Sequence, residues 1–266
     1  MTTPFATLFE HCLLILSGNE TQTMLQGQLG CDMHQLDTKQ AQYTTVCNRQ
    51  GQVVASLWVM QHQDQPNTFY LLTASKQTAQ IVLNVLTPFT QLARITMQLS
   101  DDTVLMASQQ LHIEHSSQCH TYQTAPYSMQ LIIGPHETMT LIQKHFKIKY
   151  KNGTLDHDHW LVAMIQNDIP IIDHNNSAIF TPHKLGSLQT LGINLKKGCF
   201  VGQEIIARTE YLGKKKHSIS AYFGPKSTLT YYKDTIKIIQ SVHKGPNCHA
   251  LITASQQALS KMTKHL

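Results

Sequence analysis

Residues 195–204 read LKKGCFVGQE, and this stretch decides how the rest of the chain is interpreted. Gly198 and Gly202 flank Cys199, and apolar residues at helical spacing behind them predict a helix over 202–212. A glycine loop before a helix presents free backbone N–H groups and the positive end of the helix dipole, here beside Lys196 and Lys197. We therefore expect a corner that attracts anions and holds one thiol, and the alternative is a tight connection with a packed cysteine.

Upstream of this stretch, strand-like and helix-like segments alternate. Apolar and β-branched runs predict strands at 9–17, 43–47, 53–60, 68–72, 95–99 and 128–133. Helical spacing predicts helices that begin near Glu20 and that cover 75–85, 137–145 and 160–165. The polar segment 108–125 is expected to be a surface hairpin and linker. This mixed order favours an α+β fold with helices packed on antiparallel sheets.

Downstream, the composition changes after Leu212-Gly213. Short strands are expected at 218–223, 228–232 and 235–239, with a closing helix over 255–265. We therefore divide the chain into a core, residues 1–216, made of two interleaved α+β subdomains, and a small C-terminal β subdomain, residues 217–266.

Composition limits the classes of function. The 266 residues carry a net charge of +5, and segment 184–226 alone holds eight basic against two acidic residues. This distribution does not indicate a uniformly basic coat for nucleic acid. The six cysteines are scattered without a Cys-x-x-Cys pair, which argues against a disulfide framework and against a metal site built from local cysteines. Because no apolar stretch approaches a membrane span, a cytoplasmic protein is expected.

The motif KGCFVGQE at 197–204 resembles the signature of the YgfZ family, which has Lys-Gly-Cys, an aromatic, any residue, and then Gly-Gln-Glu. Gly18, the segment LQGQL at 25–29 and Asp32 resemble the N-terminal block of that family, and segments at 169–182 and 207–215 extend the likeness. The resemblance spans roughly residues 9 to 217. It implies a T-protein-like folate-binding fold, related to the glycine-cleavage aminomethyltransferase.

The resemblance also implies a ligand, partners and a function. The ligand would be tetrahydrofolate or another reduced folate. The partners would be iron–sulfur proteins or their assembly factors, with support for the assembly or repair of iron–sulfur enzymes, including those of tRNA modification. Direct sequence-specific binding of nucleic acid and membrane association are not expected, and the protein is expected to be a monomer.

Several residues match positions of the family site. Trp160 resembles a tryptophan that the family uses against folate, and a flat ring gains about 0.5–1.5 kcal/mol from an aromatic face; the alternative is a core residue. The second folate tryptophan of the family falls near His11, whose imidazole can still stack and hydrogen-bond. A further departure is Gln166-Asn167-Asp168-Ile169-Pro170, where the family usually shows Glu-Ala-Gly-x-Pro. Through the signature, the resemblance also implies folate contacts for Lys197, Gly198, Gly202, Gln203, Glu204 and Arg208.

No catalytic mechanism follows from the sequence, although Cys199 is the candidate functional thiol. An iron–sulfur cluster needs about four thiolate ligands, so Cys199 alone cannot hold such a cluster. Asp156-His157-Asp158-His159 resembles a metal cluster, but Asp156 or Asp158 is more simply a helix N-cap, and no metal site is expected. The second class of function is a folate-dependent aminomethyltransferase. It would need an acid near folate N5, which the sequence does not locate.

Overall fold

The structure is a computed structural model that describes residues 5–7, 11–107, 119–125, 129–149, 154–155, 157–213 and 217–263. Its strands are β1 (Phe5–Thr7), β2 (Cys12–Ser17), β3 (Gln40–Cys47), β4 (Val53–Gln61), β5 (Thr68–Thr73), β6 (Thr96–Leu99), β7 (Thr103–Ala107), β8 (His120–Ala125), β9 (Gln130–Gly134), β10 (Thr154–Leu155), β11 (His217–Pro225), β12 (Ile236–Lys244) and β13 (Asn247–Ser255). Its α-helices are α1 (Thr21–Gln28), α2 (Lys76–Leu92), α3 (His136–Lys149), α4 (His157–Gln166), α5 (Gln203–Leu212), α6 (Lys226–Tyr231) and α7 (Gln256–Thr263). Two short 3-10 helices are η1 (Met33–Gln35) and η2 (Pro182–Lys184).

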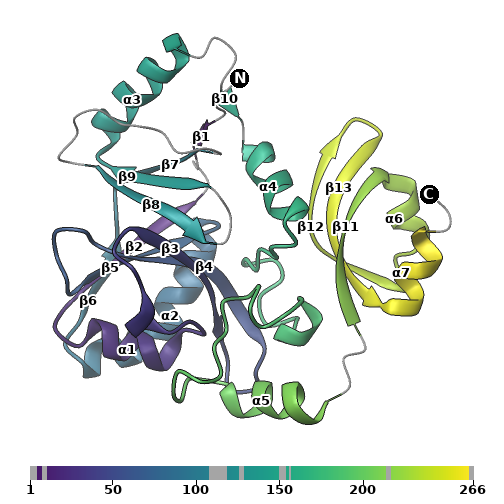
Figure 1. The fold of residues 1–266 in the computed structure, drawn as a ribbon, viewed down its shortest axis with the longest axis horizontal. Coiled ribbons are helices and arrows are strands. Elements are labelled where there is room, and N and C mark those ends of the chain that lie inside the picture. Colours follow the sequence, from purple (N-terminus) through teal and green to yellow (C-terminus); the bar gives the residue numbers. More distant parts are fainter. Residues whose placement is uncertain are drawn as a thin grey trace.

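Ten strands form one sheet in the order β10-β1-β7-β9-β8-β3-β4-β5-β2-β6 (Figure 1). The pairs β1–β10 and β3–β8 are parallel, and the other pairs are antiparallel. The β3–β8 pair joins the half built from β2 to β6 with the half built from β1 and β7 to β10. The α+β class expected from the sequence is confirmed.

The central strand β4 is buried on both faces. Trp58 and Met60 belong to the apolar cluster that contains Trp160, whereas Leu57 and Val59 belong to the cluster that packs against α1 and α2. Because side chains alternate across a strand, each layer receives every second residue of β4. Burial of a large apolar side chain contributes about 1.5–3 kcal/mol, so this strand links the two layers strongly.

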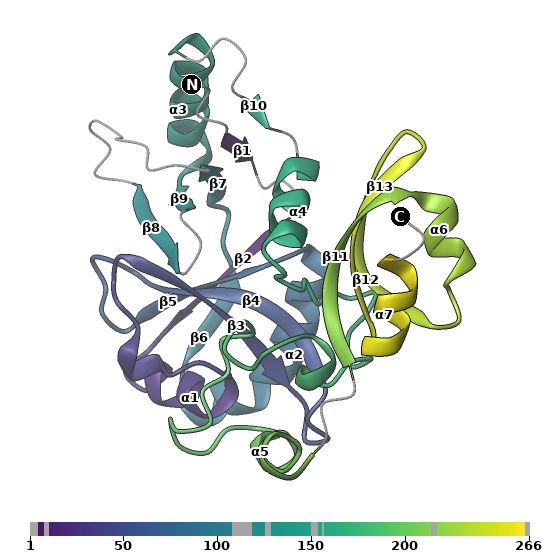
Figure 2. The ribbon, with the colours of Figure 1, turned by 45° about the vertical axis from the view of Figure 1, so that its right-hand side comes forward.

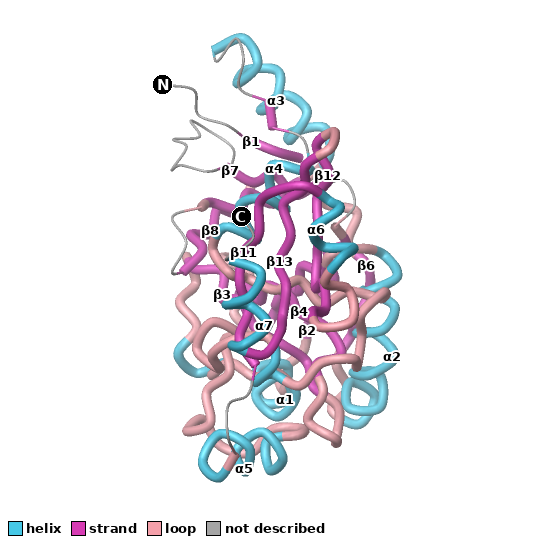
Figure 3. The backbone as a smooth tube through the Cα atoms, turned by 90° about the vertical axis from the view of Figure 1, so that its right-hand side faces the viewer, coloured by secondary structure: helices cyan, strands magenta, loops and turns pink. Residues whose placement is uncertain are grey.

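A second, three-stranded antiparallel sheet has the order β11-β13-β12. Helix α4 contacts β12 and β13 on one side and β1 on the other, so it lies between the two sheets (Figures 1 and 2). Helices α6 and α7 cover the face of the small sheet that points away from α4 (Figure 3). On this face Leu229 and Met262 belong to the apolar cluster of the small sheet. None of the helices in the described residues combines the length and the apolarity needed to cross a membrane.

The structure corrects several expected elements. Residues 228–232, expected as a strand, lie largely in α6. Strands β11 and β12 lie on opposite sides of β13, so the segment that connects them, which contains α6, must cross over the sheet. The end of segment 108–125 is not a linker but strand β8, which pairs with β9 and β3. Helix α2 continues to Leu92 and includes Pro88. Residues 108–118, Asp156 and the expected division at 214–216 lie outside the described residues.

Candidate functional site

The loop formed by residues 195–202 runs into α5 and is closed by one side chain. The Gln203 Nε2 atom donates to the Leu195 carbonyl at 3.0 Å, and the Gln203 Oε1 atom accepts from the Phe200 N–H at 3.3 Å. The Phe200 side chain is buried in the core. Gln203 therefore fixes the shape of the loop from within, rather than pointing to a ligand.

The same loop is bound to the segment 25–29. The Gln26 Nε2 atom donates to the Lys197 carbonyl at 2.8 Å, and the Lys197 ammonium donates to the Gln26 carbonyl. The Val201 N–H donates to the Gly27 carbonyl at 3.2 Å. Burial lowers the pKa of Lys197, and its ammonium lies 5.2 Å from the centre of the Phe200 ring. The two stretches that carry the YgfZ resemblance are thus packed against each other, and Lys197 is engaged within that joint.

Gly202 is required by a close backbone approach. It is the N-cap of α5 with φ +83°, a left-handed conformation that glycine adopts readily. A Cβ atom at this position would lie 2.4 Å from the Asn48 carbonyl oxygen in the β3–β4 turn. Gly198 is also left-handed, at φ +103°, but its missing Cβ would face open space. The second glycine of the motif therefore docks the loop onto the hairpin.

Cys199 is the exposed member of the six free cysteines. Cys31, Cys47 and Cys248 are buried, and burial raises the pKa of Cys31 to about 11 and that of Cys47 to about 12. The thiolate is the reactive form, so these buried thiols are poor nucleophiles. Cys199 is exposed, whereas its neighbour Phe200 is buried in the core.

Trp160 lies on α4 with only 1% of its surface exposed. Its indole Nε1 atom is buried and has no hydrogen-bond acceptor among the described residues. The side chain lines a narrow cavity together with Tyr43, Trp58 and His11. This cavity has a volume of about 20 Å³, which is room for roughly one water molecule. A buried N–H donor without an acceptor is rare and costs about 1–3 kcal/mol, which marks this point as one that a ligand or water can satisfy.

A larger cleft adjoins the Trp160 cavity. It has a volume of about 720 Å³ and shares His11, Ala74 and Ile171 with the smaller cavity. The His11 ring stands edge-on to Trp160, with ring centres 5.7 Å apart and an angle of 76° between the planes. His11 therefore lies between the cleft and the indole, next to Ala74 and Ile171, which also line both spaces.

The floor and rim of the cleft come from residues 171–180 and from β12. Gln240 on β12 accepts from the Ile171 N–H at 2.5 Å and donates to the Ile169 carbonyl at 3.2 Å. Asn176 donates to the carbonyls of Ile171 and Ile239 at 3.1 and 3.0 Å. These bonds tie the segment before η2 to the C-terminal sheet, so the cleft is shaped by both sheets.

The charged side chains of the cleft are few. Asp173 is the one carboxylate among the described residues that line it, and the basic residues there are Lys237, His174 and His11. The Asp173 carboxylate accepts from the N–H and the side-chain amide of Asn175 at 2.8 and 3.2 Å. The cleft thus offers one oriented acid, one ammonium and several amides around an apolar floor.

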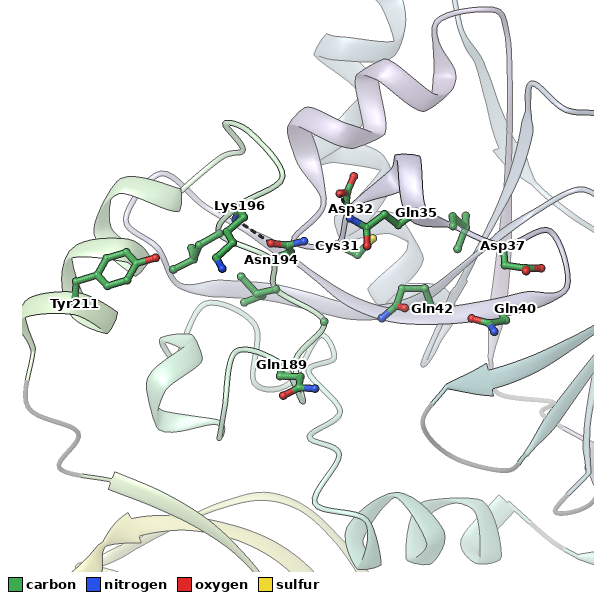
Figure 4. Close-up of a pocket in the computed structure, with 14 residues that line it drawn as sticks. Cys31, Asp32, Gln35, Asp37, Gln40, Gln42, Gln189, Asn194, Lys196 and Tyr211 are labelled. Atoms are coloured by element: carbon green, nitrogen blue, oxygen red, sulfur yellow. Dashed lines mark hydrogen bonds between the residues drawn. The ribbon is translucent and has the colours of Figure 1, made fainter.

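A second cavity of about 500 Å³ lies between η1, β3 and the loop 189–196. In Figure 4 it runs from Tyr211 and Lys196 at one end to Gln40 and Asp37 at the other. Its wall is rich in amides, and Asn194 accepts from the Lys196 N–H at 2.8 Å. It shares no lining residue with the cleft of about 720 Å³, which we call the Trp160 cleft. The Trp160 cleft is the better candidate site because it adjoins the cavity that contains the buried indole donor.

The structure brings together only part of the predicted site. His11 and Trp160 meet, as a shared folate position requires. Lys197, Gly198, Gly202, Gln203, Glu204 and Arg208 lie on the loop and on α5, at the end of the molecule away from α4 (Figure 1), and line neither the cleft nor the Trp160 cavity. Folate contacts by these six residues stay a prediction. Sequence reasoning missed Lys237 and Gln240, because only the packing of β12 onto α4 brings them to the cleft.

Comparisons with known proteins agree with this fold and with the resemblance to the YgfZ family. No model of a known protein family matches the chain. The tRNA-modifying protein YgfZ of Sodalis glossinidius is 25% identical over 232 residues, which cover 80% of this chain and 69% of that protein. The YgfZ protein of Buchnera aphidicola is 26% identical over 227 residues, 79% of this chain and 70% of that protein.

A solved structure supports the same relation at the level of the fold. The glycine cleavage system aminomethyltransferase T from Bartonella henselae superposes with a TM-score of 0.71, covering 96% of this chain and 78% of its own, at 11% identity. At that identity the likeness concerns the fold alone. The chain is therefore a relative of the YgfZ proteins and has the fold of the glycine-cleavage aminomethyltransferase.

Proposed function

We propose that the chain binds a reduced folate in the cleft beside Trp160 and acts in the cytoplasm as an accessory protein for iron–sulfur enzymes. The observation that carries the proposal is the buried indole N–H of Trp160, which has no acceptor among the described residues and borders the cleft through His11. The fold shared with an aminomethyltransferase supports the same site.

The described residues fit a folate in size and in chemistry. A cleft of about 720 Å³ lies within the range of about 300–1,000 Å³ typical of small-molecule sites. The flat bicyclic ring of a folate would contact the aromatic wall, and its amide edge would meet the amides of the rim. The carboxylates of its glutamate tail would be attracted by Lys237. Because the space at the indole itself holds only about one water, the ring would reach Trp160 after a rotation of His11.

The function downstream of folate binding follows from the relatives. The YgfZ proteins are named tRNA-modifying proteins, which supports a role for this chain in tRNA modification. We place this role in the assembly or repair of the iron–sulfur enzymes that modify tRNA. Cys199 is the thiol that a partner can reach, because it is exposed on the loop, whereas the cleft binds the folate elsewhere in the molecule.

Calorimetric titration with tetrahydrofolate tests the binding site. Trp160→Phe keeps an aromatic face but removes the N–H donor, and the loss of one hydrogen bond of about 0.5–1.5 kcal/mol weakens binding roughly 2- to 12-fold. Tyr211→Phe, in the second cavity, is the matched control and leaves the affinity unchanged. Equal affinity of Trp160→Phe and the unsubstituted protein, or a loss confined to Tyr211→Phe, would place the ligand elsewhere.

The alternative function is a true aminomethyltransferase, and the fold of the Bartonella henselae protein favours it. Asp173 is the acid that such a reaction would use, because it is the carboxylate among the described residues of the cleft. The protein is mixed with tetrahydrofolate and an aminomethylated lipoyl carrier, and one-carbon transfer is followed. Transfer that Asp173→Asn abolishes would establish the enzyme. Binding of folate without transfer supports the accessory protein.

A further inference from the structure

Three metal-ligating side chains meet outside the Trp160 cleft. His62 follows β4, Asp64 lies in the turn before β5, and His120 is the first residue of β8. One ligand atom from each side chain lies within 4.8 Å of the others. The residues are remote in sequence, and the sheet order β8-β3-β4-β5 brings them to one place.

The surroundings hold these side chains in position. The Gln63 amide donates to the Thr121 carbonyl at 2.8 Å and so ties the β4–β5 turn to β8. The His62 ring stacks on Tyr70, with centres 5.4 Å apart. It lies 4.3 Å from the His120 ring, centre to centre. Such fixed orientation of the ligands lowers the cost of binding an ion.

Burial and charge suit a cation with one open side. His120 is buried, His62 is half-buried and Asp64 is exposed. The Asp64 carboxylate lies 3.8 Å from the His120 Nδ1 atom. Imidazole nitrogens are common ligands of divalent metal ions.

We propose that His62, Asp64 and His120 form a binding site for a first-row divalent metal ion such as zinc. Two imidazoles and one carboxylate are a ligand set used for zinc and iron(II), with the remaining positions open to water or to a further ligand. Metal–ligand bonds of about 2.0–2.2 Å place neighbouring ligand atoms roughly 3.3–3.5 Å apart in a tetrahedral site. The Asp64 and His120 atoms, 3.8 Å apart, are already close to this spacing. The widest pair, at no more than 4.8 Å, would close by at most roughly 1.5 Å when an ion binds.

Titration of the chelator-treated protein with zinc, by calorimetry, tests the site, and the visible absorption of bound cobalt(II) reports its geometry. We expect one equivalent to bind and Asp64→Asn to weaken binding at least about 10-fold, with a loss above roughly 100-fold for His62→Asn. Because Asp64 is exposed, its variant keeps the fold even if a change at the buried His120 does not.

Two control variants separate this site from the other zinc ligands of the chain, which has 16 histidines and an exposed thiol. His243→Asn removes an exposed imidazole on β12, and Cys199→Ser removes the exposed thiol. Both leave the one-equivalent binding unchanged if the proposal is right. The proposal is overturned if no stoichiometric binding occurs, if Asp64→Asn and His62→Asn bind zinc like the unsubstituted protein, or if Cys199→Ser abolishes binding.

Discussion

Replacement of Gly202 by alanine tests the packing of the 195–204 loop onto the β3–β4 hairpin. The new Cβ atom would lie 2.4 Å from the Asn48 carbonyl oxygen and 3.2 Å from the Gly51 Cα atom. That oxygen already accepts from the Gly51 N–H at 2.9 Å, so the turn cannot shift without disturbing its own hydrogen bond. Relief of the contact therefore requires movement of packed backbone.

The cost can be worked out from two contributions. A left-handed conformation costs a residue with a Cβ atom about 1–2 kcal/mol. Forcing an additional methyl group into packed surroundings typically costs about 1–3 kcal/mol. We expect a loss near 3 kcal/mol in the free energy of unfolding, which lowers the melting temperature by roughly 6–12 °C for a chain of this size.

The matched control is Gly27→Ala in α1, on the other side of the same joint. No heavy atom beyond its chain neighbours and the backbone of its own helix lies within 4 Å of the added Cβ, and its φ is not left-handed. An alanine in a helix is favoured over glycine by about 0.5–1 kcal/mol, so this variant keeps or gains stability. Melting curves of both variants by circular dichroism decide the matter. A Gly202→Ala protein that melts within about 2 °C of the unsubstituted protein would show that the docking argument is wrong.

Three further outcomes are expected. Limited alkylation of the native protein, mapped by peptide analysis, labels Cys199 before Cys119. Equal rates at the two thiols would show that Cys199 is not a preferentially reactive thiol. Burial and the nearby Lys244 lower the pKa of His249; the unfolded chain therefore binds this proton more readily, and stability falls as the pH drops below about 6.5. Urea unfolding at pH 7.5 and 5.5 shows a smaller loss for His249→Asn, and an identical loss refutes this contribution. Lysines 214–216 lie outside the described residues, and their neutralisation is expected to weaken binding of an anionic folate mainly at low ionic strength, because salt screens charges across water over ~10 Å at 0.1 M. A loss of affinity that salt does not change would point to damage of the fold instead.

Much of the fold could be predicted, because it follows from local patterns. The β3–β4 hairpin, α5 and α7 are where periodicity and turn residues place them. The strand predicted at 228–232 was wrong, because the sheet order, in which β13 separates β11 from β12, outweighed the β-branched composition of this segment.

The site was predictable only where a motif marked it. Trp160 and His11 were identified by resemblance and do meet. The signature residues were expected to attract an anion, but Lys197 donates to the Gln26 carbonyl within a packed joint, a contact that neither stretch reveals alone. A lysine in a motif does not disclose whether its ammonium is free.

The proposed metal ligands could not be predicted from the sequence either. The adjacent carboxylates and histidines of 156–159 resemble a site in the sequence, whereas His62, Asp64 and His120 do not. The latter three converge only because β8 pairs with β3, next to β4. Strand register across a sheet is set by tertiary packing, which a single sequence does not specify.

The most direct test of the account uses the fluorescence of Trp160. The chain has two tryptophans, Trp58 and Trp160, so Trp58→Phe leaves Trp160 as the single tryptophan, which is excited at a wavelength that tyrosine does not absorb. Tetrahydrofolate is added to the folded variant while calorimetry follows binding in the same buffer. We expect a saturable quenching of the emission with the same midpoint as the heat signal, because the folate ring approaches the indole. Unchanged emission at a folate concentration that calorimetry shows to be saturating would contradict it.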